Sequence, residues 1–78
     1  MTLKIISSED VVFEGEVRIV NLPGANGSFA VLKDHASLVS TLVPGKIVYE
    51  TVDGENASIP VMGGLVDVDN NIVSVCLY

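Results

Sequence analysis

The sequence has few of the residues from which catalytic and metal sites are usually built. Its 78 residues include one histidine, His35, and one cysteine, Cys76. A single cysteine cannot form a disulfide within the chain, and it suits a reducing compartment. Without a Cys-x-x-Cys motif or a second histidine, only carboxylates remain as metal ligands. Asp67 and Asp69 beside two asparagines loosely suggest a cation site, but a solvated strand next to a turn explains them more simply, and we expect no metal.

Basic residues are also scarce. Four of them, spread along the chain, oppose ten acidic residues and leave a net charge of −6. A nucleic-acid binder needs a basic patch to displace counterions from phosphates, so this class of function is excluded. An acidic balance suits a soluble protein, or one that meets a basic partner surface.

Long hydrophobic runs and aromatic residues are missing too. No apolar run approaches the ~20 residues of a membrane span, and no secretion signal opens the chain, so we expect a cytoplasmic or equivalent location. The four aromatic residues are two Phe and two Tyr. The core must therefore be built from Val, Ile and Leu, which favour strands. With 49% hydrophobic and 18% charged residues, the chain is well outside the range of disordered sequences.

What the sequence does contain is turn signals at short, regular intervals. Asn-Gly, Asp-Gly and Asn-Asn pairs tolerate the positive φ of tight hairpins, and Pro-Gly and Gly-Gly pairs separate further segments. Between them, Val66 and Val68 alternate with two aspartates, which predicts a hairpin with the strand after the Asn pair. Lys46–Val52 is predicted to pair with Asn56–Met62 in the same way. Ser37–Leu42, which begins with a weak helical signal, is also interpreted as a strand.

Turns that recur every 8–12 residues are typical of an all-β fold. We predict about nine or ten short strands in a small two-sheet β-sandwich or flattened barrel. Residues 1–78 form a single domain in this interpretation, and we expect it to be monomeric when isolated.

No catalytic site is predicted. His35 is flanked by Asp34 and lies near Ser37 and Ser40, but residues adjacent in a chain seldom provide the geometry of a Ser-His-Asp triad. A turn-forming role or a contact at the rim of a surface suits His35 better. Cys76 lies in an apolar strand and is predicted to be buried and inert. The glycine-bearing stretches lack the spacing of phosphate-binding loops, so no cofactor is expected.

One alternative function rests on Lys33. Lipoyl and biotinyl carrier domains are also all-β, acidic and of this length, and they present one lysine at a hairpin tip. Here Lys33 stands between Leu32 and Asp34, which fits neither the lipoyl pattern, with an acid before the lysine, nor the biotinyl pattern, with methionines on both sides. The carrier interpretation fits the composition and fails at the motif.

Three blocks carry a more specific resemblance. In the segment 26–45, Asn-Gly-Ser-Phe-Ala-Val-Leu-Lys-Asp-His-Ala-Ser-Leu leads through a strand into Pro-Gly. Ser7–Gly15 reads Ser-x-Glu-x-x-x-Phe-x-Gly, and Met62–Val68 contains Gly-Gly-Leu-Val-Asp-Val. All three, in register from about Leu3 to Cys76, resemble the epsilon subunit family of F-type ATP synthases, called delta in mitochondria.

The resemblance implies a non-catalytic rotor subunit of the central stalk. In the family, the sandwich binds the gamma subunit and rests on the membrane c-ring, coupling proton- or sodium-driven rotation to ATP synthesis. Such a subunit is peripheral, on the cytoplasmic face of the bacterial inner membrane. By the resemblance, Asn26, Gly27 and Ser28 match the c-ring-facing loop. Gamma-facing positions are matched by Ser7, His35 and Ser40.

The sequence also departs from the family pattern. Ser28 stands where the family often has Glu, Lys33-Asp34 replaces Pro-Gly before His-Ala, and Ser37 replaces a Pro after it. The family's two C-terminal helices, which inhibit ATP hydrolysis and in some members bind ATP, have no counterpart in residues 1–78. We therefore expect neither inhibition nor an ATP site from these residues.

Overall fold

The computed structural model describes residues 1–8 and 10–78, and they form an all-β sandwich, as predicted. The described residues contain eight strands, not the nine or ten expected, and residues 10–24 form a single long strand. The strands are β1 (Thr2–Ser7), β2 (Asp10–Gly24), β3 (Gly27–Leu32), β4 (Leu38–Leu42), β5 (Gly45–Thr51), β6 (Asn56–Val61), β7 (Gly64–Asp69) and β8 (Ile72–Leu77). No helix in this part of the chain has the length and apolar character of a membrane span.

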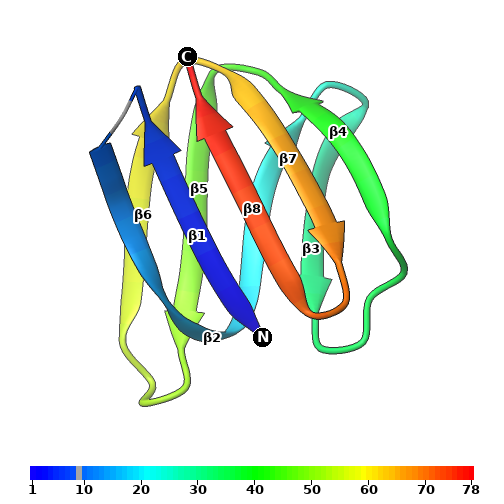
Figure 1. Cartoon of the computed structure of the whole chain (residues 1–78). Coiled ribbons are helices and arrows are strands. Elements are labelled where there is room, and N and C mark those ends of the chain that lie inside the picture. Colours follow the sequence, from blue (N-terminus) through cyan, green and yellow to red (C-terminus); the bar gives the residue numbers. More distant parts are fainter. Residues whose placement is uncertain (9) are drawn as a thin grey trace.

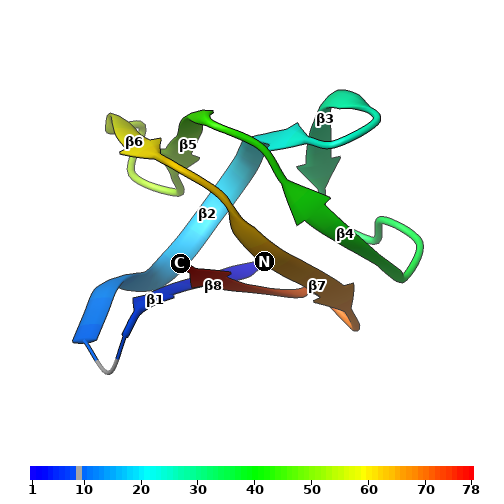
Figure 2. The ribbon, with the colours of Figure 1, turned by 90° about the horizontal axis from the view of Figure 1, so that it is seen from above.

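The strands form two layers, which Figures 1 and 2 show face-on and from above. The front sheet contains β4, β7, β8 and β1, followed by the first half of β2. The back sheet contains β3, the second half of β2, β5 and β6. All pairs are antiparallel except β1 with β8, so the first and last strands of the domain run side by side in the same direction.

Strand β2 joins the two layers. Its first half pairs with β1 from Glu16 to Asp10, and its second half lies between β5 and β3. The registers shift between Ile5 and Ile6 on β1 and between Val17 and Ile19 on β2. Such irregularities bend a strand and increase its twist, which lets one strand serve both sheets.

Both predicted hairpins are confirmed. Strands β7 and β8 pair from Asp69–Ile72 outward across Asn70 and Asn71, whose φ angles are 50° and 62°. Two consecutive residues with positive φ are typical of a type I′ turn, which asparagine tolerates better than most residues. Strands β5 and β6 pair across the Asp53-Gly54 turn, where Gly54 has a φ of 88°. The strand predicted at 37–42 is β4.

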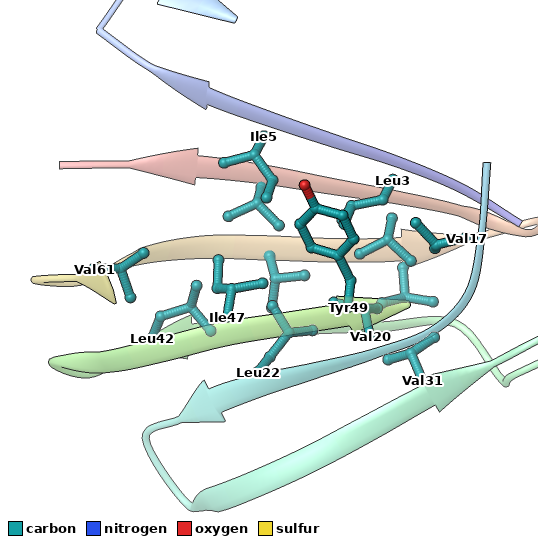
Figure 3. Packing of buried hydrophobic residues seen from close by; sticks show 14 residues of the cluster. Leu3, Ile5, Val17, Val20, Leu22, Val31, Leu42, Ile47, Tyr49 and Val61 are labelled. Carbon is teal, nitrogen blue, oxygen red and sulfur yellow. The ribbon is translucent and has the colours of Figure 1, made fainter. Parts of the chain in front are cut away.

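The core lies between the two layers and is almost entirely aliphatic, as Figure 3 shows. Only one aromatic ring, that of Tyr49 on β5, is among the buried residues, and in Figure 3 it reaches toward Leu3 and Ile5 of the front sheet. No polar or charged residue is buried in the described part of the chain. The buried set is Leu3, Ile5, Val17, Val20, Leu22, Val31, Leu42, Ile47, Tyr49, Val61, Val66, Val68, Val73 and Val75.

The prediction that Cys76 is buried is wrong. Cys76 is exposed, because Val73 and Val75 face the core and the two-residue period of the strand turns Cys76 to the outside. The apolar character of the segment suggested burial, but the position of Cys76 in the alternation decides the outcome.

Candidate functional site

The β2–β3 turn presents the first group of predicted site residues. Asn26, Gly27 and Ser28 are all exposed, and the Ala25 amide donates to the Thr41 carbonyl at 2.9 Å. Gly27 has a φ of 119°, which residues with a side chain rarely adopt. At Gly24 a Cβ would come within 2.7 Å of the Phe29 ring. The two glycines allow the tight turn, which therefore holds Asn26 and Ser28 out into solvent.

Ser7, predicted to face the gamma subunit, lies at the same end of the sandwich as this turn. It closes β1, and a row of register partners connects it across the strands to the β2–β3 turn. That row is Ser7, Leu77, Gly64, Leu42, Gly24 and Gly27. Ser7 and the predicted c-ring-facing residues thus share one end of the molecule.

His35 lies at the opposite end, in the loop between β3 and β4. Because β3 has six residues, it separates this loop from the β2–β3 turn by roughly 20 Å. The His35 side chain is exposed, its Nδ1 lies 2.7 Å from the Ala36 carbonyl oxygen, and its amide donates to the Leu32 carbonyl at 3.2 Å. The structure therefore does not bring Ser7 and His35 together at one point.

The residues around His35 are held by another part of the chain. The Asp34 amide donates to Asn71 Oδ1 at 2.6 Å, and Asn71 Nδ2 donates back to Asp34 Oδ1 at 3.0 Å. We call this reciprocal pair the Asp34–Asn71 clasp. Beside it, the Ser37 hydroxyl donates to Asp69 Oδ1 at 2.7 Å. Asp34 and Ser37 thus bond to the β7–β8 hairpin rather than to His35, so no Ser-His-Asp triad is assembled here.

Ser40 occupies a third location. It alternates with exposed Val39 and Thr41 on β4, so its half-buried side chain faces the space between the layers. Its hydroxyl donates to the Thr41 carbonyl at 3.1 Å. Strands β3 and β4 do not pair with each other, so Ser40 lies on a strand with an open edge.

The outer face of the front sheet carries an exposed apolar strip that the sequence analysis did not single out. Val11, Ile6, Cys76 and Leu65 are consecutive register partners on β2, β1, β8 and β7, and we call them the apolar band. Leu65 is exposed, as are Met62 and Tyr78 beyond the ends of their strands and Val39 on β4. The sequence held a sign of this apolar strip. Leu65 points to the same side of its strand as Asp67 and Asp69, where a strand that faces only water would carry a polar residue.

Below the apolar band the same face becomes acidic. Asp67 and Asp69 line a shallow hollow with Ser37 and Val39, and Glu14 and Glu16 lie on the far strand of the sheet. Glu16 pairs with the N-terminal amino group at 3.3 Å. Within residues 1–8 and 10–78, no group of three or more His, Cys, Asp or Glu side chains is arranged to hold a metal ion. The face therefore combines an apolar band with carboxylates, a pattern suited to a protein partner.

Comparison with known proteins identifies the family of this domain. Residues 1–77 match the family described as "ATP synthase, Delta/Epsilon chain, beta-sandwich domain". The chain belongs to this family. The match covers every strand described above, so the whole sandwich is a delta/epsilon-type domain.

Similar curated proteins agree with this assignment. An "ATP synthase epsilon chain" of a Nitratiruptor species is 44% identical over 71 residues, which cover 91% of this chain and 55% of that protein. One of the same name from Campylobacter fetus subsp. fetus is 41% identical over 73 residues, covering 94% of this chain and 57% of that protein. The chain thus spans little more than half the length of these relatives.

Solved structures share the delta/epsilon sandwich at low sequence identity. A chain in the mitochondrial ATP synthase of Euglena gracilis, in a structure described as OSCP/F1/c-ring, has a TM-score of 0.89 at 22% identity and covers 96% of this chain and 48% of that one. A chain in the central stalk/c-ring structure from Tetrahymena thermophila has a TM-score of 0.79 at 15% identity, covering 99% and 62%. At these identities the likeness supports the fold.

Family membership bears on the carrier alternative. In the structure, Lys33 lies in a turn between β3 and β4, which do not pair, and not at the tip of a hairpin as a lipoyl or biotinyl lysine would. The delta/epsilon match across the whole sandwich disfavours the carrier interpretation further.

Proposed function

We propose that this chain is a non-catalytic rotor subunit of an F-type ATP synthase, which joins the gamma subunit to the c-ring and so couples ion-driven rotation to ATP synthesis. The observation that carries the proposal is the match of residues 1–77 to the delta/epsilon sandwich, with relatives named as epsilon chains. These relatives are bacterial, so we place the protein on the cytoplasmic face of the inner membrane, as a peripheral part of the synthase.

The outer face of the front sheet is our proposed gamma-binding surface. Ser7 lies at one corner of this face and His35 beside the opposite corner, with Ser40 on its edge strand β4. Strand spacings of about 4.8 Å place β1 and β4 roughly 14 Å apart, which is within the width of a standard protein interface. Ser7 and His35 lie near opposite ends of this face, and the half-buried Ser40 faces the space between the layers, so a partner on the outer face would reach Ser40 only around the open edge of β4.

The β2–β3 turn is our proposed contact with the c-ring. Asn26 and Ser28 offer an amide and a hydroxyl on a rigid support, a common arrangement for binding loops. The net charge of −6 favours association with basic loops of a partner. Ser28 supplies no charge where the family resemblance implies a frequent Glu, so the contact we propose is a polar one.

Recovery of partners from membranes tests this function. A tagged chain, expressed in its native host and purified in mild detergent, should recover the gamma and c subunits of the ATP synthase. Val39→Asp on the outer face of the front sheet should reduce the recovery of gamma at least tenfold, because it replaces an exposed apolar side chain beside Asp67 and Asp69 with a third carboxylate that a bound partner would have to bury. Val48→Asp is the matched control, since Val48 is an exposed valine on the outer face of the back sheet.

Two results would count against the proposal. Failure of the unmodified chain to recover either subunit would contradict the rotor function itself. Equal loss with Val39→Asp and Val48→Asp would contradict the choice of the front sheet. An intact mass that shows a lipoyl or biotinyl adduct on Lys33 would instead support the carrier alternative.

A further inference from the structure

We propose that Asn71 is a positioning residue for His35: through the Asp34–Asn71 clasp, it holds the β3–β4 loop in the conformation in which the loop meets its partner. This inference rests on the proposed function, because it assigns to Asn71 an effect on the gamma contact at His35. Asn71 itself lies 36 residues further along the chain, on the turn between β7 and β8.

Besides the clasp, the loop is held by the bond from the His35 amide to the Leu32 carbonyl and by the Ser37–Asp69 hydrogen bond. Residues 33–37 are exposed, and β3 and β4 do not pair across them. Asp34 has a φ of 64°, a left-handed conformation that is unfavourable for most residues with a side chain. The clasp satisfies both the amide and the carboxylate of Asp34 in this conformation. Asp34 immediately precedes His35, so the backbone at Asp34 sets where the imidazole points.

The anchor, Asn71, is itself held by backbone pairing. Asn71 belongs to a two-residue turn closed by the Asp69–Ile72 pair, and its own carbonyl accepts from the Thr2 amide at 2.9 Å. Its side-chain amide both accepts from and donates to Asp34, because asparagine carries an acceptor oxygen and an NH₂ donor on one planar group. The clasp therefore fixes the Asp34 end of the loop to the front sheet, and the Ser37–Asp69 hydrogen bond holds its other end.

Asn71→Asp breaks the clasp with almost no change in size. The new carboxylate has no hydrogen to donate, and it faces the carboxylate of Asp34. Asn70→Asp is the matched control, because it makes the same change of charge and residue in the same turn, also at a positive φ, and no side-chain hydrogen bond of Asn70 is seen in the described residues. Differences between the two variants therefore report the clasp.

The double variant Asp34→Asn with Asn71→Asp should restore the clasp with the roles reversed. Asparagine at position 34 can donate its side-chain amide and its backbone N–H to the two oxygens of aspartate at position 71. Asparagine also tolerates the left-handed conformation at position 34. The net charge of the double variant equals that of the original chain, so a rescue cannot come from charge alone.

Two measurements on the full chain test the proposal. The first is amide hydrogen exchange of residues 34 and 35 in the isolated protein, followed by NMR. We expect exchange about tenfold faster in Asn71→Asp than in Asn70→Asp, and a return to near the rate of the original chain in the double variant. The second is binding to the immobilised gamma subunit of the host ATP synthase, which should weaken about five- to tenfold in Asn71→Asp only and recover in the double variant.

The outcomes separate this proposal from the function on which it rests. Equal exchange in Asn71→Asp and Asn70→Asp, or no rescue in the double variant, would overturn the clasp. Faster exchange with unchanged gamma binding would overturn the positioning role. If the unmodified chain fails to bind gamma while the exchange rates follow the expected pattern, the failure lies with the proposed function and not with the clasp.

Discussion

The rings of Phe13 and Tyr49 lie against each other, with centroids 4.3 Å apart and planes inclined at 35°. Phe13 belongs to the half of β2 that pairs with β1 in the front sheet, and Tyr49 belongs to β5 in the back sheet. The contact therefore connects the two layers. It joins a half-buried ring to Tyr49, the one aromatic residue among the buried residues of the described chain.

Phe13→Ala should lower the free energy of unfolding by about 2–3 kcal/mol, because it removes a half-buried ring and leaves Tyr49 without its neighbour. Phe13→Leu should cost less than about 1.5 kcal/mol, since it keeps most of the apolar volume. Urea unfolding with an unchanged m-value measures both. Equal losses would show that the ring contact contributes little.

Stability should fall in alkaline solution because of Tyr49. Burial raises the pKa of the Tyr49 hydroxyl above its ordinary value of 10.0. The fold thus favours the neutral phenol, while the unfolded chain ionises near pH 10. The contribution is complete below pH 10 and is lost as the pH rises through the raised pKa of the folded state. Between about pH 9 and pH 11, the urea midpoint of Tyr49→Phe should decline less than that of the original chain. Equal declines in the two proteins would contradict this assignment.

Gamma binding should depend more on His35 and Ser40 than on the acidic face. We expect His35→Ala or Ser40→Ala to weaken it about tenfold and Asp67→Ala less than threefold, because exposed single charges contribute little to affinity. Asp69→Ala should also weaken gamma binding only slightly, although somewhat more than Asp67→Ala, because Asp69 accepts a hydrogen bond from Ser37. Titration on immobilised gamma, with urea unfolding to confirm each fold, measures the series. Similar losses throughout would refute this assignment of sites.

The c-ring contact should be separable from the gamma contact. Asn26→Ala together with Ser28→Ala should reduce the recovery of c subunit from membranes several-fold and that of gamma far less, because the turn shares its end of the sandwich with Ser7 but lies opposite His35. Quantitative immunodetection of both subunits in the same eluate makes the comparison. Loss of both subunits together would mean that the turn does not act as a distinct contact.

Gly27→Ala should destabilise the fold even though nothing lies within 4 Å of the added methyl group. The reason is the φ of 119°, and we expect a loss of about 1 kcal/mol or more. Ser28→Ala next to it should be nearly neutral, because Ser28 is exposed and has ordinary strand geometry. Thermal unfolding of the two variants gives the comparison. If Gly27→Ala is as stable as the original chain, backbone strain at this turn is not important for stability.

The parts of the fold that the sequence predicted are local ones. The β5–β6 and β7–β8 hairpins follow from a turn residue between two alternating segments, and both are present. The parallel pairing of β1 with β8 joins residues about 70 positions apart and leaves no local signature. The length of β2 was missed for a similar reason, because its bend depends on two sheets that the sequence does not reveal.

The candidate site divides in the same way. The exposure of Asn26–Ser28 could be expected from the turn chemistry alone. The clasp could not, because Asp34 and Asn71 meet only once β4 has paired with β7 and β7 with β8. The apolar band is an intermediate case. The alternation within each strand predicts that Leu65 and Cys76 face outward. Only the register of β7 with β8 shows that these two residues lie side by side.

The place of β8 between β1 and β7 determines when the sandwich can form. Residues 72–77 are the last of the domain to leave the ribosome, yet they fill the middle of the front sheet. Until then β1 lacks one of its two partners, and the apolar inner face of the sheet stays open to water. With synthesis at about 5–20 residues per second, a nascent chain spends seconds in this incomplete state. The sandwich can therefore close only after β8 has been made, and folding should be slow, as is typical of proteins dominated by pairing between distant strands.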